Sequence, residues 1–145
     1  PAKEVFQHLN QTVSAVWIDN AQIDERIQQQ AKAEAIQAAK RKSGWEGHYF
    51  GGVAFKYQRP TTDYRLAAAI GAIYVDVVTT SGPATGRAAS VSKIQAIASG
   101  STAENVSQFL PWVDYFLVAT GISQSFYQLD LTKTKELAQI IQQSS

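Results

Sequence analysis

Basic and aromatic side chains alternate over residues 38–65, and this stretch is the part of the chain best suited to chemistry with a ligand. Six of the 13 lysines and arginines lie between residues 40 and 65 beside only two acids, so this window carries a net charge of +4 in a chain whose total is +1. Basic side chains near phosphate release counterions, and aromatic rings offer stacking faces to bases. The window therefore predicts a surface for a polyanion. The alternative is a solvated basic loop whose rings are buried in the core.

No catalytic or metal-binding pattern accompanies this window. His8 and His48 are far apart in the sequence with no HxxxH or HExxH spacing, and there are no cysteines. The glycines after residue 43 match neither a Walker loop nor a dinucleotide fingerprint. Asp24 and Glu25 are adjacent, so they would point to different faces of a helix. We therefore expect no enzyme activity, no metal and no cofactor, with an unfamiliar active site as the alternative.

The first 42 residues are predicted to form a helical arm. Residues 3–42 contain no proline or glycine and are rich in Ala, Gln, Glu, Lys and Ile, which favour helix because they lose little rotamer freedom. We expect one long helix, or two in tandem with Asp19 or Asn20 capping the second. A helix of this length spans roughly 60 Å, whereas a compact domain of this size has a radius of gyration of about 15 Å. The arm would therefore extend beyond its own globule.

The remainder is predicted to be an irregular segment followed by helices. Residues 43–60 form a basic, aromatic and glycine-rich elbow, in which Val53–Tyr57 has a weak strand pattern that we interpret as loop. Residues 61–145 are expected to form a helical bundle with helices at about 61–79, 85–99, 101–118 and 132–142. Asp63 is one N-cap candidate for the first of these. Ile73–Thr80 could be a strand by itself, but the alanines before it favour helix.

Length and composition favour one extended all-α domain over residues 1–145. This length is ordinary for one domain. No secretion signal and no apolar run long enough to span a membrane occurs in the sequence. A product inside the cell is the expectation that follows.

The helical arm, the elbow and the bundle together resemble the major capsid proteins of archaeal filamentous and rod-shaped double-stranded DNA viruses. In that family helical arms wrap the duplex, and dimers build a helical filament. The resemblance implies that basic residues at corresponding places in the chain contact phosphate. The aromatic setting of His48 adds a residue expected to stack on bases or to contact phosphate. The predicted nucleic-acid-binding residues are Lys32, Lys40, Arg41, Lys42, His48, Lys56, Arg59 and Arg65. One departure is that the segment Lys3–Ala39 has more acids than bases, so its first half is expected to pack on protein.

The function predicted from the sequence is therefore that of a structural coat protein. It would bind double-stranded DNA through the phosphate backbone without sequence preference, and assemble with itself or a paralogous coat subunit into a helical filament. Its location would be the virion, assembled in the host cytoplasm. The alternative is a filament or scaffold subunit that contacts only protein, such as a pilus-like or secretion-associated helical protein.

Overall fold

The computed structural model of the chain describes residues 2–84, 87, 89–96, 106–108, 110–112, 122–125 and 128–143. These residues form α-helices, a sheet of three parallel strands and a pair of antiparallel strands. The all-α prediction is therefore wrong, and the fold is mixed α/β. The chain divides into two compact units, Pro1–Thr79 and Thr80–Ser145, called the first and the second unit below.

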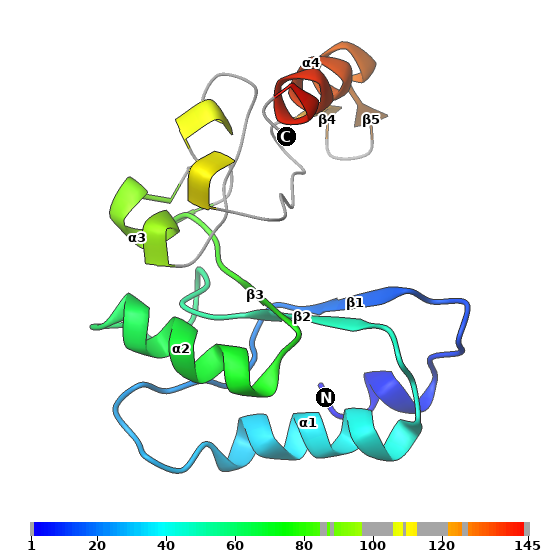
Figure 1. The fold of residues 1–145 in the computed structure, drawn as a ribbon, viewed down its shortest axis with the longest axis vertical. Helices are drawn as coiled ribbons and strands as arrows, with labels where there is room; N and C mark the ends of the chain where they lie inside the picture. The colour runs from blue at the N-terminus through cyan, green and yellow to red at the C-terminus, as the bar shows by residue number, and fades with distance from the viewer. Residues whose placement is uncertain are drawn as a thin grey trace. The chain divides into compact units, whose positions relative to one another are not determined.

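The first unit alternates strands and helices. Its elements are the short 3-10 helix η1 (Val5–Gln7), β1 (Ala15–Ile18), α1 (Ala31–Ser43), β2 (His48–Gly52), α2 (Tyr64–Tyr74) and β3 (Val77–Thr79). The strands are parallel and lie in the order β1-β2-β3. Because parallel crossovers are right-handed, strands added in one direction carry their helices on one face. Both α1 and α2 accordingly lie on the same side of the sheet (Figure 1).

The strand register assigns side chains to the two faces of this sheet. Val16 pairs with Tyr49, and Ile18 pairs with Gly51, so these residues share the face that the helices cover. Trp17 pairs with Phe50, which pairs with Val77, so these three share the opposite face. On the helix face Tyr49 is buried and its ring lies 5.5 Å from that of Phe6, edge to face.

The helical arm predicted for residues 1–42 is not formed. Only its last part, from Ala31, is in α1, while Ala15–Ile18 is β1 and residues 19–30 are a loop. The short apolar run Ala-Val-Trp-Ile gains more by pairing with β2 than by continuing a helix, because tertiary contacts routinely override helix propensity. The arm's end was predicted correctly: Gly44 follows α1 with a φ of 71°, and Lys40, Arg41 and Lys42 occupy the last turn.

The elbow predicted for residues 43–60 contains the central strand of the sheet. β2 includes Gly51 and Gly52, which the sequence pattern indicated as breakers. A Cβ at Gly52 would lie 1.9 Å from the carbonyl oxygen of Asp19, and one at Gly51 would lie 2.4 Å from Cγ1 of Val75. Both glycines therefore permit the close approach of a neighbouring segment, which is a recognised use of glycine inside a strand.

The helix predicted for residues 61–79 is correct at its start and wrong at its end. Asp63 is the N-cap of α2, where its carboxylate accepts a hydrogen bond from the Leu66 amide at 2.9 Å. The helix ends at Tyr74, and Val77–Thr79 pairs with β2 as β3. The β-branched residues at the end of this run therefore form a strand, although the alanines before them favour helix.

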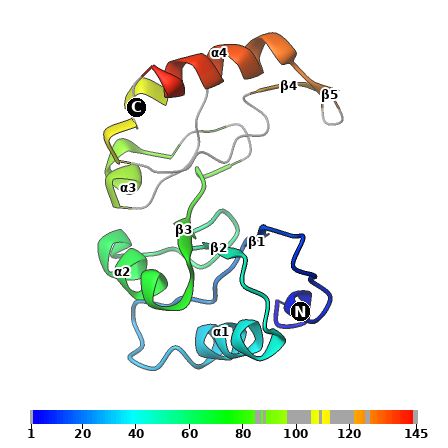
Figure 2. The same cartoon turned by 45° about the vertical axis from the view of Figure 1, so that its right-hand side comes forward.

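The second unit contains short elements and one longer helix. They are α3 (Val91–Ala96), η2 (Val106–Gln108), η3 (Leu110–Trp112), β4 (Ser123–Ser125), β5 (Gln128–Leu129) and α4 (Leu131–Gln142). The helix predicted for residues 132–142 is confirmed as α4, which Asp130 caps. Much of the helices predicted at 85–99 and 101–118 lies outside the described residues. Figure 2 shows α4 and the pair β4-β5 from a second direction.

None of the helices in the described part of the chain is both long and apolar enough to cross a bilayer.

Candidate functional site

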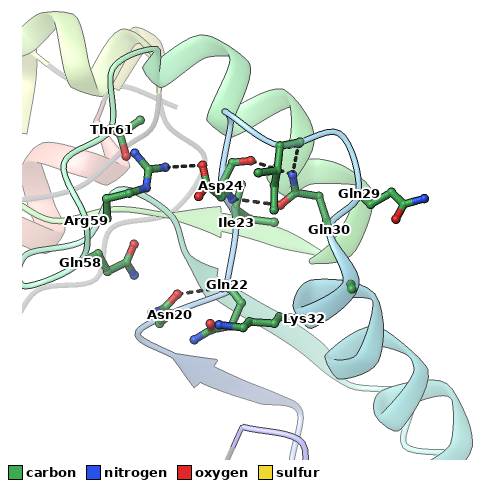
Figure 3. Close-up of a pocket in the computed structure, with 12 residues that line it drawn as sticks. Asn20, Gln22, Ile23, Asp24, Gln29, Gln30, Lys32, Gln58, Arg59 and Thr61 are labelled. Atoms are coloured by element: carbon green, nitrogen blue, oxygen red, sulfur yellow. Dashed lines mark hydrogen bonds and ion pairs between the residues drawn. The ribbon is translucent and has the colours of Figure 1, made fainter.

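A cavity of about 400 Å³ opens where β1 and β2 end, at what we call the carboxyl edge of the sheet. Two loops and the first residues of α1 line it: the β1-α1 loop, residues 19–30, and the β2-α2 loop, residues 53–63. Ligands of parallel α/β proteins bind outside the carboxyl ends of the strands. The lining residues are Asn20, Gln22, Ile23, Asp24, Ile27, Gln29, Gln30, Ala31, Lys32, Gln58, Arg59 and Thr61 (Figure 3).

Gln30 holds the β1-α1 loop in shape. Its side-chain oxygen accepts a hydrogen bond from the Asp24 amide at 3.0 Å, and its side-chain nitrogen donates to the carbonyl oxygens of Asp24 at 2.7 Å and Ile27 at 2.8 Å. Gln30 is buried. One amide side chain thus satisfies three backbone groups of a loop that has no regular structure, as buried backbone groups require.

Arg59 joins the two loops through acidic side chains. Its guanidinium donates to both carboxylate oxygens of Glu25, and to Asp24 Oδ1 at 3.0 Å. The side chain of Glu25 is only 3% exposed, and its Oε1 also accepts from the amide of Thr62 at 2.8 Å and from the hydroxyl at 2.9 Å. Such a forked, charge-assisted arrangement fixes geometry as well as adding energy.

The charges of this network balance one another. Asp24 also accepts from Arg26, with the guanidinium Nη2 2.8 Å from Oδ2. Arg26 and then Arg59 hold the pKa of Asp24 well below its usual range. The Arg59 guanidinium lowers the pKa of Glu25 from 4.5 to about 2, against the opposing effect of burial. Two acids therefore face two arginines, and this network, of which Asp24 and Arg59 line the cavity, is neutral overall.

We expect Glu25 to make the first unit less stable in acid. Folding depresses its pKa from 4.5 to about 2, so its contribution is fully present above pH 4.5 and is lost as the pH falls through that interval. The chain with Glu25→Gln should then show a shallower loss of stability between about pH 5 and pH 2, measured as urea midpoints. Glu34→Gln, at an exposed position of α1, is the control. Equal slopes for the native and Glu25→Gln chains would contradict the assignment.

The part of the cavity at the start of α1 is positive. Ala31 and Lys32 line it, and they are the first two residues of α1, whose N-cap Gln30 makes no side-chain capping hydrogen bond. The orphan amides and the dipole of a helix N-terminus favour a negative ligand. In Figure 3, Asn20, Gln22 and Lys32 lie together at one end of the view, away from Asp24, Gln30 and Arg59.

A strained turn shapes this positive end. Gln22 has a φ of 62°, in the left-handed region that side chains other than glycine rarely adopt. Asn20 stabilises it by accepting a hydrogen bond from the Gln22 amide at 2.8 Å, which is the Asx turn that asparagine favours. The amide side chains of both residues line the cavity. Residues held in sparsely populated conformations often belong to functional sites.

Gln58 ties the ends of the two strands together beneath the cavity. Its side-chain nitrogen donates to the carbonyl oxygens of Asp19 at 2.7 Å and Gly52 at 3.3 Å, and its side-chain oxygen accepts from the Phe55 amide at 3.2 Å. The carbonyl of Gly52 also accepts from the Ala21 amide at 2.8 Å. These hydrogen bonds attach the loops that line the cavity to the ends of β1 and β2.

The eight residues predicted to contact nucleic acid do not form one surface. The helix α1 runs from the carboxyl edge of the sheet to the opposite, amino edge, where β2 begins. Its last turn and the start of β2 therefore place one group at the amino edge: Lys40, Arg41, Lys42 and His48. The start of α1 and the β2-α2 connection place the other group at the carboxyl edge: Lys32, Lys56, Arg59 and Arg65.

Two of these eight residues are also paired with acids within the first unit. Arg59 contacts Asp24 and Glu25, and Lys40 Nζ lies 2.5 Å from Asp76 Oδ2. That same oxygen accepts from the Tyr49 amide at 2.7 Å. Burial opposes ionisation of Asp76, but the hydrogen bonds from Lys40 and Tyr49 outweigh it and lower the pKa. Lys40 therefore links the last turn of α1 to the residue before β3. By contrast, Lys32, Lys42 and Arg65 are exposed.

The sequence reasoning missed most of the residues that shape the cavity. Asn20 was assigned as a possible helix cap, and Gln30 and Gln58 were given no role. A usable signal was present: three runs with strand character, at residues 15–18, 48–52 and 77–79, are separated by helical segments, and polar residues follow the first. Such alternation is typical of parallel α/β units, in which residues after a strand line the ligand site.

The described residues contain no group of three or more His, Asp or Glu placed to hold a metal ion. Comparisons of the chain with known protein families, curated proteins and solved structures found no match.

Proposed function

We propose that the first unit binds a small anionic molecule in the cavity at the carboxyl edge. The observation that carries this proposal is the joint presence in one cavity of the α1 N-terminus without a side-chain cap, the exposed ammonium of Lys32 and the amide groups of Asn20 and Gln22. Because the acids Asp24 and Glu25 are already paired with arginines, they do not cancel the positive end. A carboxylate or a phosphate group has the chemistry that fits.

The size of the cavity supports a ligand of metabolite size. Pockets for small molecules have volumes of about 300–1,000 Å³, and this one, at about 400 Å³, is at the lower end of that range. The network around Gln30 and Arg59 fixes the walls before a ligand arrives, which reduces the entropy cost of binding.

The earlier expectation of a coat protein on double-stranded DNA stays a prediction, as do its partner subunits and its place in a virion. It has lost its main support, because the helical arm that carried the resemblance is absent and the predicted phosphate contacts lie at two opposite edges. Small-ligand binding needs neither feature, so we prefer it.

We expect Lys32→Gln to weaken the binding of inorganic phosphate about tenfold, the loss of one charge-assisted contact worth about 1.4 kcal/mol. Calorimetric titration of the native and variant chains measures this. The matched control is Lys42→Gln, which removes the same charge from the same helix at its other end and should leave the affinity unchanged.

Two results would contradict the proposal. One is that phosphate binds with equal affinity to the native chain and to Lys32→Gln. The other is that, of the two variants, only Lys42→Gln weakens binding. That result would place the anion site at the amino edge, at the predicted cluster of Lys40, Arg41 and Lys42.

A further inference from the structure

Three polar side chains that line the cavity keep hydrogen-bonding groups available for a ligand. Thr61 is half-buried, and within the described residues its hydroxyl group has no hydrogen-bond partner. In the same part of the chain no partner meets the side-chain amide of Gln22, or the amide nitrogen of Asn20, whose oxygen accepts from the Gln22 backbone at 2.8 Å. By contrast, the amides of Gln30 and Gln58 already bond to backbone groups.

These groups are spread along the cavity and not gathered at one point. In Figure 3, Asn20 and Gln22 lie beside Lys32, whereas Thr61 lies at the other side of the view. Ile23 lies between them and also lines the cavity. A ligand that reaches from Lys32 to Thr61 would therefore pass an aliphatic side chain and meet hydrogen-bonding groups on both sides of it.

The rest of the cavity wall favours a neutral and non-aromatic body for this ligand. Asp24 and Arg59 line it, and their charges are already balanced within their ion pairs. None of the described residues that line the cavity is aromatic, whereas protein sites for nucleobases commonly stack them on aromatic side chains. Beyond its anionic group the ligand is therefore expected to be polar, uncharged and without a base.

We propose that the ligand of this cavity is a phosphate ester of a sugar or another polyol. The proposal rests on the anion site proposed above, because the phosphate group binds at the start of α1 beside Lys32. The hydroxyl groups of the carbon chain then bond to Thr61 and to the amides of Asn20 and Gln22. A hydroxyl group both donates and accepts hydrogen bonds, as threonine and amide side chains do, so the two match without charge. The C–H groups of the chain pack on Ile23.

The test compares ribose 5-phosphate with n-pentyl phosphate, which carries the same phosphate group on five carbons but has no hydroxyl groups. Calorimetric titration of the native chain should show ribose 5-phosphate binding about tenfold more tightly or better, because a site built to hydrogen-bond hydroxyl groups disfavours an analogue without them. Adenosine 5′-monophosphate, which adds a base to the same sugar phosphate, should bind no more tightly than ribose 5-phosphate.

Thr61→Val separates the hydroxyl groups of the ligand from its phosphate. It should lower the affinity for ribose 5-phosphate about fivefold, the loss of one neutral hydrogen bond. It should leave the affinity for inorganic phosphate unchanged, since Thr61 lies away from Lys32 (Figure 3). Thr12→Val, at an exposed position that does not line the cavity, is the control and should change neither affinity.

The two proposals fail in different ways. If neither inorganic phosphate nor ribose 5-phosphate binds, the anion site is contradicted, and the sugar phosphate with it. If inorganic phosphate binds but ribose 5-phosphate binds no more tightly than n-pentyl phosphate, only the polyol is overturned, and this comparison needs no variant to fold. Tighter binding of adenosine 5′-monophosphate than of ribose 5-phosphate, or an unchanged affinity of Thr61→Val for ribose 5-phosphate, would overturn it as well.

Discussion

Replacing Gly52 with alanine is expected to destabilise the chain by about 3 kcal/mol or more, the upper end of the cost of overpacking a well-packed site. The added Cβ would lie 1.9 Å from the carbonyl oxygen of Asp19 and 3.0 Å from the ring of Phe55. The first of these neighbours is backbone and cannot rotate away. The end of β1 must therefore move, and the hydrogen bonds that Gln58 and Ala21 make to these strands must weaken.

Urea unfolding of Gly52→Ala and of Gly44→Ala measures this effect against a matched control. A Cβ at Gly44 would meet nothing within 4 Å, but the residue has a φ of 71°, so alanine there should cost only about 1 kcal/mol. If Gly52→Ala were no more destabilising than Gly44→Ala, that result would contradict the close contact between Gly52 and the carbonyl group of Asp19.

Replacing Gln30 with alanine is expected to cost about 2–4 kcal/mol of unfolding free energy, because a buried group that loses its hydrogen-bond partner costs about 1–3 kcal/mol. The substitution leaves the Asp24 amide and the carbonyls of Asp24 and Ile27 without the side chain that pairs with them. It should also abolish phosphate binding, because the loop from residue 24 to residue 30 forms one wall of the cavity.

Gln29→Ala is the control for this prediction. Gln29 lies next to Gln30 and also lines the cavity, but it is exposed, so its replacement should change stability by less than about 0.5 kcal/mol. Denaturant titration gives both values, and amide hydrogen exchange shows whether residues 24–30 open. Equal stabilities of the two variants would mean that Gln30 does not organise the loop.

Three consecutive glutamines differ in the structure in a way that no local sequence pattern predicts. Residues 28–30 are all glutamine, yet only Gln30 is buried. Composition indicates helix for all three, and no local pattern distinguishes the one whose amide satisfies three backbone groups. That distinction depends on how a loop folds back over residues 24–27, which is a tertiary property.

Local signals were reliable where the cause was local. The cap at Asp63, the left-handed Gly44 after α1 and the last helix of the chain could all be predicted because each depends on residues within one turn. The strands gave a weaker signal, because β1 and β2 are only four and five residues long. Their pairing joins segments about thirty residues apart, in the alternation typical of parallel α/β units. Because Gly51 and Gly52 were interpreted only as residues that break regular structure, the central strand was not predicted.

The clustering of charge in sequence was equally misleading about the site. Residues 40–65 carry six basic side chains, but the chain crosses the sheet once between His48 and Gly52. Residues before this strand lie at the amino edge and residues after it at the carboxyl edge. A basic window in the sequence therefore becomes two separate groups in space.

The most direct test of the anion site is a nitrogen-15 correlation spectrum of the chain during titration with inorganic phosphate. We expect the largest shifts at the backbone amides of residues 31–33 and at the side-chain amides of Asn20 and Gln22, and these shifts should saturate as phosphate is added. Lys42 and His48 should not respond. Shifts confined to residues 40–48, or none that saturate, would contradict it.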